Sequence, residues 1–148
     1  MDRRKFCISS AAVAAGLAAE IALPSAPVPL HKVIFDSRFA AGRAFAVAAA
    51  GAGRTTAAIR GDVTALWFDD LRLRWATPGG AIAGMTTLRS LFCLEQLAKD
   101  HWMRVMVRAE HARTDAAANA QRVQSIIGGR QRGLPLPADP RLVSWVIA

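Results

Sequence analysis

Cysteine is scarce in this chain of 148 residues, in which Cys7 and Cys93 are the two thiols. Two cysteines are too few for a disulfide scaffold, a cysteine-based zinc finger or an iron–sulfur cluster held within the chain. The haem-attachment motif Cys-x-x-Cys-His is absent, and the three histidines are scattered at positions 31, 101 and 111 without metal-ligand spacing. We therefore expect neither a metal site nor a cofactor.

Nucleotide-binding and nucleic-acid-binding patterns are also missing. The chain has neither a glycine-rich phosphate loop ending in Lys-Ser or Lys-Thr nor a Gly-x-Gly-x-x-Gly fingerprint. Basic residues outnumber acidic ones by 19 to 11, giving a formal charge of +8, yet no run of five basic residues occurs. This dispersed charge argues against nucleic acid as a partner. Sixteen of the cations are arginines, whose planar forks favour a small carboxylate or phosphate.

The first two dozen residues are typical of an export signal rather than of a folded domain. A basic Arg3-Arg4-Lys5 precedes Phe6 and an alanine-rich apolar run that reaches about residue 19. This run is too short and too weakly apolar for a good transmembrane helix. The residues Arg3, Arg4 and Phe6 resemble the Arg-Arg-x-Phe core of twin-arginine export signals. An ordinary amphipathic N-terminal helix is the alternative.

The resemblance implies that the twin-arginine export machinery carries the folded protein to the periplasm. Passengers of this route often hold a redox cofactor or travel with a larger partner that does. We expect residues 1–26 to form a signal helix that is either cleaved or retained as an anchor. Residues 27–31 are then a proline-rich linker, and residues 32–148 are a single domain.

Apolar runs and turn residues predict strands that alternate with helices. Strands are expected at residues 32–36, 55–59, 81–85, 104–109 and 142–147, and helices at 39–48, 63–75, 86–102 and 115–127. Ser37, Asp62 and either Thr86 or Thr87 are expected to cap helix N-termini. Because strands alternate with helices, we expect a compact three-layer α/β domain with a mainly parallel sheet of four to five strands.

Polar residues that follow the strands are the candidate ligand-binding groups, because ligands of parallel sheets bind beyond the carboxyl ends of the strands. They are Asp36, Arg38, Asp62, Thr86, Thr87 and Arg108. We expect them to border one polar cleft, in which Arg38 and Arg108 bind an anion beside a helix N-terminus. Simple capping or solvent exposure is the alternative for each residue.

Glu110 and His111 are the candidate catalytic residues, because a carboxylate paired with an imidazole can exchange protons near neutral pH. Neighbouring residues at a strand end point in opposite directions, so a solvated loop is the alternative. Cys93 is expected to be a buried structural thiol, and the four tryptophans are expected to anchor the core or an interface. The adjacent Asp69 and Asp70 are expected on a solvated helix face.

Three functions remain open on these observations. The first is an exported binding or accessory domain for a small anionic ligand or a partner subunit. The second is a cofactor-independent periplasmic enzyme of hydrolase or isomerase type, with its site at the strand ends. The third is a non-catalytic subunit of an exported redox complex, which would dock through an apolar patch at Trp75 or Trp145.

Overall fold

The computed structural model describes residues 29–110, 116–128 and 139–148. The expected signal and His111 lie outside these residues. The strands are β1 (Lys32–Asp36), β2 (Thr56–Ile59), β3 (Ile82–Thr87), β4 (Val105–Glu110) and β5 (Leu142–Ile147). The helices are α1 (Ala40–Gly51), α4 (Leu88–Lys99), α5 (Ala116–Gly128), and one continuous helical segment made of α2 (Thr64–Leu66), the π-helical η1 (Trp67–Leu71) and α3 (Arg72–Arg74).

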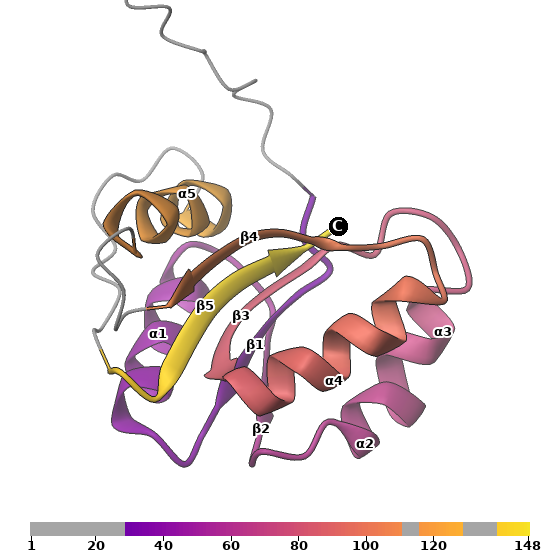
Figure 1. Cartoon of the computed structure of the whole chain (residues 1–148), viewed down its shortest axis with the longest axis horizontal. Helices are drawn as coiled ribbons and strands as arrows, with labels where there is room; N and C mark the ends of the chain where they lie inside the picture. The colour runs from indigo at the N-terminus through magenta and orange to yellow at the C-terminus, as the bar shows by residue number, and fades with distance from the viewer. Residues whose placement is uncertain (1–28, 111–115, 129–138) are drawn as a thin grey trace, which may run out of the picture.

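The five strands form one sheet in the order β2-β1-β3-β5-β4. Strand β1 pairs parallel with β2 and β3, whereas β5 pairs antiparallel with β3 and β4. The arrow of β5 accordingly points against those of β3 and β4 (Figure 1). The sheet is therefore mixed, and the expectation of a mainly parallel sheet was wrong.

The direction of β5 is opposite to the one that the end of α5 would favour, because a helix that ends where parallel strands begin usually leads into another parallel strand. Arg54, just before β2, donates hydrogen bonds from Nε to Ile127 O at 2.8 Å and from Nη2 to Ile126 O at 3.1 Å. The C-terminus of α5 thus lies at the edge where the parallel strands begin. Strand β5 starts at the opposite edge, where Leu142 pairs with Thr87, so it must run antiparallel. Its place between β3 and β4 leaves all six of its residues buried.

Helices cover both faces of the sheet, as Figure 1 shows, which gives the expected three layers. A hydrophobic core lies on each face of the sheet, and neighbouring residues of β1 point into different cores. Ile34 packs with α4 and with the segment α2–α3, whereas Val33 packs with α1 and α5. The first core also holds Leu71, Leu91, Leu94, Trp75 and Trp145, and the second holds Phe45, Met85, Val107, Val123 and Val146. Trp75 and Trp145 are core anchors, so neither forms the expected docking patch.

Helix ends confirm one expected cap and correct another. Thr87 caps α4, because its Oγ1 accepts a hydrogen bond from Ser90 N at 3.4 Å. Ser37 does not cap α1, which begins three residues later at Ala40. Its N–H and Oγ instead donate to Ile59 O, at 2.9 and 3.1 Å, and so extend the pairing of β1 with β2.

Candidate functional site

The carboxyl ends of β1, β2, β3 and β4 share one edge of the sheet, and β5 begins at that edge. This arrangement follows from the strand directions, since β5 runs against β3 and β4. It brings the end of β1 close to the loop after β2 and to the first turn of α4. One contact shows the proximity directly, because Ser90 Oγ donates to Gly61 O at 3.1 Å.

Asp36 and Arg38 form a buried ion pair at this edge. The Asp36 side chain is fully buried and accepts three hydrogen bonds from Arg38, from the backbone N at 3.1 Å, Nε at 3.0 Å and Nη2 at 2.7 Å. These bonds to Asp36 raise the pKa of the Arg38 guanidinium above its ordinary value. The arrangement fixes the plane of a guanidinium that remains 43% exposed.

Gly61 makes room for this guanidinium. A Cβ built at Gly61 would lie 2.4 Å from Arg38 Nη2, which is too close for any real side chain. The φ of Gly61 is 87°, in the left-handed region that glycine adopts readily. The backbone conformation therefore favours glycine, and a larger residue would also have to displace the end of the Arg38 side chain from Asp36.

A second ion pair repeats the geometry of the first. Asp139 accepts hydrogen bonds from the Arg141 backbone N at 3.0 Å, from Nε at 3.0 Å and from Nη2 at 2.8 Å. Bonding to Asp139 likewise raises the pKa of Arg141. Arg141 immediately precedes β5 and is 68% exposed. Both pairs have the tripeptide Asp-x-Arg, at residues 36–38 and 139–141, but the same tripeptide occurs at residues 2–4 and 70–72, so it does not identify such a pair by itself.

The two pairs meet at the ring of Phe39. The guanidinium carbon of Arg38 lies 5.4 Å from the ring centroid, and that of Arg141 lies 4.8 Å from it. Both distances are in the range of cation–π contacts. Arg43, on the first turn of α1, donates from Nη1 to Ser37 O at 2.7 Å and adds a third guanidinium nearby. We call Arg38, Phe39, Arg43 and Arg141, with Asp36 and Asp139, the arginine cluster; it carries three positive and two negative charges.

Of the other candidates at this edge, Thr86 is structural. It is fully buried, and its Oγ1 accepts a hydrogen bond from Trp145 Nε1 at 3.0 Å and donates to Thr87 O at 3.1 Å. Asp62 organises the start of α2, because its Oδ1 accepts from Thr64 N at 2.9 Å and from Thr64 Oγ1 at 2.6 Å. The Thr64 hydrogen bonds lower the pKa of Asp62. Local hydrogen bonds thus account for the positions of both side chains.

Arg108 and Glu110 lie away from the pair of Asp36 and Arg38. They are on β4, where Arg108 Nε contacts Glu110 Oε1 at 3.1 Å. Strands β3 and β5 separate β4 from β1, and three strand spacings amount to about 14 Å. The structure therefore does not bring Arg108 or Glu110 to Arg38, and the shared cleft expected for them is not formed. Sequence reasoning missed Phe39 and Arg141, although the ring of Phe39 contacts the guanidiniums of both Arg38 and Arg141.

Two further side chains differ from expectation. Cys93 is exposed rather than buried, because its helix α4 buries the face that carries Leu91, Leu94 and Ala98. Asp70 is not on a solvated face, since its carboxylate pairs with Lys32 and with His31 Nε2 at 2.9 Å. Burial of Asp70 opposes ionisation, but the hydrogen bonds from Lys32 and His31 hold its pKa below the usual value. This contact ties η1 to the start of β1.

Within the described residues, no group of three or more His, Cys, Asp or Glu side chains is placed to hold a metal ion. No helix in these parts of the chain is long and apolar enough to cross a membrane. Comparison with protein-family models, with curated proteins and with solved structures found no match to this chain.

Proposed function

We propose that this protein is a small exported binding protein whose ligand is a carboxylate or phosphate anion held at the arginine cluster. The observation that carries the proposal is the convergence of Arg38 and Arg141, from opposite ends of the domain sequence, on the ring of Phe39. The +8 charge of the chain would draw anions toward such a site.

The two guanidiniums are oriented before any ligand arrives. Asp36 engages Nε and Nη2 of Arg38, and Asp139 engages the same two atoms of Arg141. Among the described residues neither Nη1 group donates a hydrogen bond, so both can donate to an anion. Because the side chains are already fixed, little rotamer entropy is lost on binding. Charge-assisted hydrogen bonds of this kind are worth about 1.5–3 kcal/mol each when well formed.

The test must separate binding from folding, because removing Arg38 would leave Asp36 buried without its cation. Arg38→Lys keeps the charge and loses the planar fork, and Arg141→Gln removes a cation whose partner is less deeply buried. Arg108→Gln is the matched control, since Arg108 is an exposed arginine paired with a carboxylate outside the cluster. The probes are inorganic phosphate and citrate, measured by titration calorimetry.

We expect Arg141→Gln and Arg38→Lys each to weaken anion binding about tenfold, and Arg108→Gln to leave it unchanged. Comparison of the phosphate and citrate arms tells which oxyanion the site prefers. Absence of saturable binding by either probe would refute the proposal. So would an equal loss of affinity in Arg108→Gln, because this would indicate diffuse attraction to a basic surface.

Export and partnership are part of the proposal. Arg3, Arg4 and Phe6 support delivery to the periplasm by the twin-arginine machinery, with the signal cleaved or kept as an anchor. A role as an accessory subunit of a larger exported redox protein fits the same route. The enzyme alternative gains no support from the described residues, because Asp36 and Glu110 are each engaged by an arginine.

A further inference from the structure

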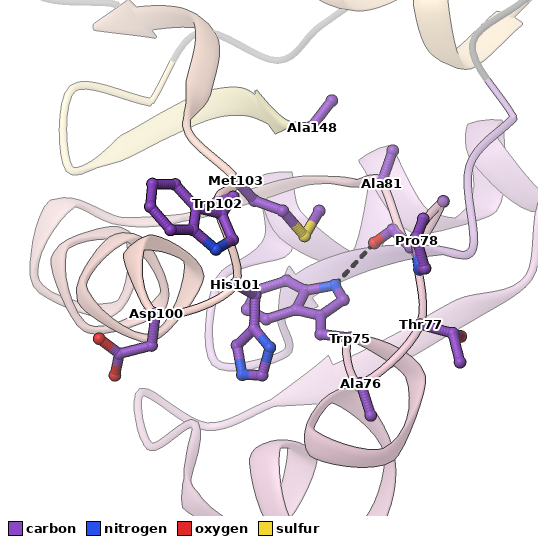
Figure 2. Close-up of a pocket in the computed structure, with 12 residues that line it drawn as sticks. Trp75, Ala76, Thr77, Pro78, Ala81, Asp100, His101, Trp102, Met103 and Ala148 are labelled. Atoms are coloured by element: carbon purple, nitrogen blue, oxygen red, sulfur yellow. Dashed lines mark hydrogen bonds between the residues drawn. The ribbon is translucent and has the colours of Figure 1, made fainter.

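The segment α2–α3 and α4 lie side by side on one face of the sheet, as Figure 1 shows, and they are held together at both ends. Near their N-termini, Ser90 of α4 donates from Oγ to Gly61 O, shortly before α2, at 3.1 Å. Toward their C-termini, the ring of His101 packs against Trp67 and Trp75, with centroid distances of 5.6 and 5.9 Å. Figure 2 shows His101 beside Trp75, where the end of α4 meets the end of α3. The two elements therefore form one rigid unit.

The outer side of this unit, which we call the α4 layer (residues 64–75 and 88–102), is rich in apolar side chains. The large apolar residues of the layer that are half or more exposed are Phe68, Leu73, Leu88, Phe92 and Trp102. Elsewhere in the described residues, only Val47 and Met106 are exposed in this way. The inner side of α4 already supplies the core, so this helix is apolar on both of its sides. A gathering of exposed apolar side chains is typical of an interaction surface.

The α4 layer is electrically neutral, although the whole chain has a formal charge of +8. Its basic side chains are Arg72, Arg74, Arg89 and Lys99, and its acidic side chains are Asp69, Asp70, Glu95 and Asp100. Two copies of so basic a chain repel each other, and this repulsion is weakest where the facing surfaces are neutral. An anionic lipid surface, by contrast, attracts a basic face. The charge balance therefore favours a second copy of the chain as the partner of this surface.

The charges of α4 also match those of a second α4 that faces it. Arg89 and Glu95 lie three residues before and three residues after Phe92, and Arg89 is exposed while Glu95 is half-buried. A two-fold axis at Phe92 makes the two α4 helices antiparallel, so that Arg89 of each copy lies opposite Glu95 of the other. Opposite charges placed in this way steer association and fix the register of an interface. Phe92, which is 59% exposed, then meets its own counterpart at the centre.

We propose that the protein associates with a second copy of itself through the α4 layer and forms a two-fold symmetric dimer. Phe68, Leu88 and Phe92 of both copies would be removed from water, which supplies the apolar part of the binding free energy. Helix α1, which carries Arg43 of the arginine cluster, covers the other face of the sheet. The inference therefore does not depend on anion binding.

The test follows the mass of the full chain by sedimentation velocity over a wide range of protein concentrations. Phe92→Asp places a charge at the centre of the proposed interface. Val47→Asp is the matched control, since Val47 is also exposed but lies on α1, outside the α4 layer. Arg89→Glu brings like charges together across the axis, and the double variant Arg89→Glu with Glu95→Arg restores opposite charges in exchanged positions. Thermal unfolding checks that every variant is folded.

We expect the native chain and Val47→Asp to dimerise at micromolar concentrations, and Phe92→Asp to weaken the dimer at least about tenfold. Arg89→Glu should also weaken the dimer, and the double variant should recover most of that loss. The inference would be overturned by a native chain that stays monomeric, or by a Phe92→Asp variant that dimerises as the native chain does. An equal loss in Val47→Asp, or a double variant that dimerises no better than Arg89→Glu, would overturn it as well.

A lipid surface is the other occupant to test. Vesicles of phosphatidylcholine and phosphatidylglycerol are sedimented with the native chain and with Phe92→Asp, at a protein concentration at which the native chain is monomeric. The apolar run near the N-terminus is the same in both proteins, so a difference between them reports on the α4 layer. We expect both proteins to bind the vesicles equally. Loss of vesicle binding in Phe92→Asp would show that the α4 layer faces a membrane and would overturn the inference.

Discussion

Arg38 and Arg141 contact the same Phe39 ring, although one follows the first strand of the domain and the other precedes the last. Strand order explains the meeting, because the end of β1 and the start of β5 lie at one edge with β3 between them. Each arginine is fixed by the aspartate two residues before it. A pair of short local motifs thus becomes one cluster through the topology of the sheet.

Export is the first prediction. A fusion of residues 1–30 to a folded reporter should reach the periplasm, and replacing Arg3 and Arg4 by lysine should hold it in the cytoplasm. Fractionation of cells followed by reporter assay measures the distribution. Unchanged export of the double variant, or export that stops when general secretion is blocked, would remove the twin-arginine interpretation.

Glycine at position 61 should be essential to the orientation of Arg38. Gly61→Ala should lower the free energy of unfolding by more than the about 1–2 kcal/mol expected for a left-handed alanine, since its Cβ would also collide with the guanidinium. Gly53→Ala is the control, because Gly53 has a φ of 79° and nothing within 4 Å of its Cβ position. Chemical unfolding curves measure both variants.

The prediction would be contradicted if Gly61→Ala lowered the free energy of unfolding by less than Gly53→Ala does. The anion affinity of Gly61→Ala provides a second readout. It should fall together with stability, whereas the affinity of Gly53→Ala should remain unchanged.

The ionisation of Asp70 should make the free energy of unfolding depend on pH. Its carboxyl has a lowered pKa in the folded protein, so its contribution is complete above the ordinary unfolded value of about 3.9 and is lost as the pH falls through the folded pKa. The pairs with His31 and Lys32 are partly exposed, so we expect about 1 kcal/mol at neutral pH. Asp70→Asn should therefore be less stable than the native chain near pH 6, and the difference should shrink as the pH falls below the unfolded value of about 3.9.

Urea unfolding over this pH range checks the Asp70 prediction, with Asp69→Asn as the exposed neighbouring control. A difference between Asp70→Asn and the native chain that stays constant down to the lowest pH would contradict it. An equal effect in Asp69→Asn would do the same, because Asp69 makes no comparable contact with β1.

Trp102→Gly should stabilise the protein, because Trp102 has a positive φ and its indole is almost fully exposed. Glycine relieves the left-handed strain, and the indole gives up no burial, so a gain of about 0.5–1 kcal/mol is expected. Trp102→Ala should show no such gain, because alanine suffers the same strain. Thermal unfolding compares the two, and a loss of stability in the glycine variant would show that the indole supports the fold.

The pattern of apolar and turn residues predicted the strands and helices well, but it predicted their arrangement in the sheet less well. The expected strand at residues 32–36 matches β1, and that at 142–147 matches β5. The expectation of a mainly parallel sheet was wrong, because a buried strand has the same apolar run whichever way it lies. The helix expected to reach residue 102 ends at Lys99. The prediction ran too far because Trp102, rather than the usual glycine, occupies the left-handed position that follows the helix.

The candidate site was predicted only in part, for a related reason. Asp36 and Arg38 follow a recognisable strand, so their position at the edge could be inferred. Arg141 precedes its strand, and only an antiparallel β5 brings it to that edge. Arg108 was expected beside Arg38 because both follow strands in a parallel arrangement, yet β3 and β5 separate them. Contacts between distant segments depend on strand order, which no local pattern encodes.

The most direct measurement of the central claim is a phosphate titration followed through the side-chain Nε–H signals of the arginines by NMR. We predict that the signals of Arg38 and Arg141 shift together and saturate with one dissociation constant, while that of Arg108 stays in place. Both cluster arginines report on the same ligand, and Arg108 is paired with Glu110 elsewhere on the sheet. Unsaturable shifts of similar size at all three arginines would contradict the account.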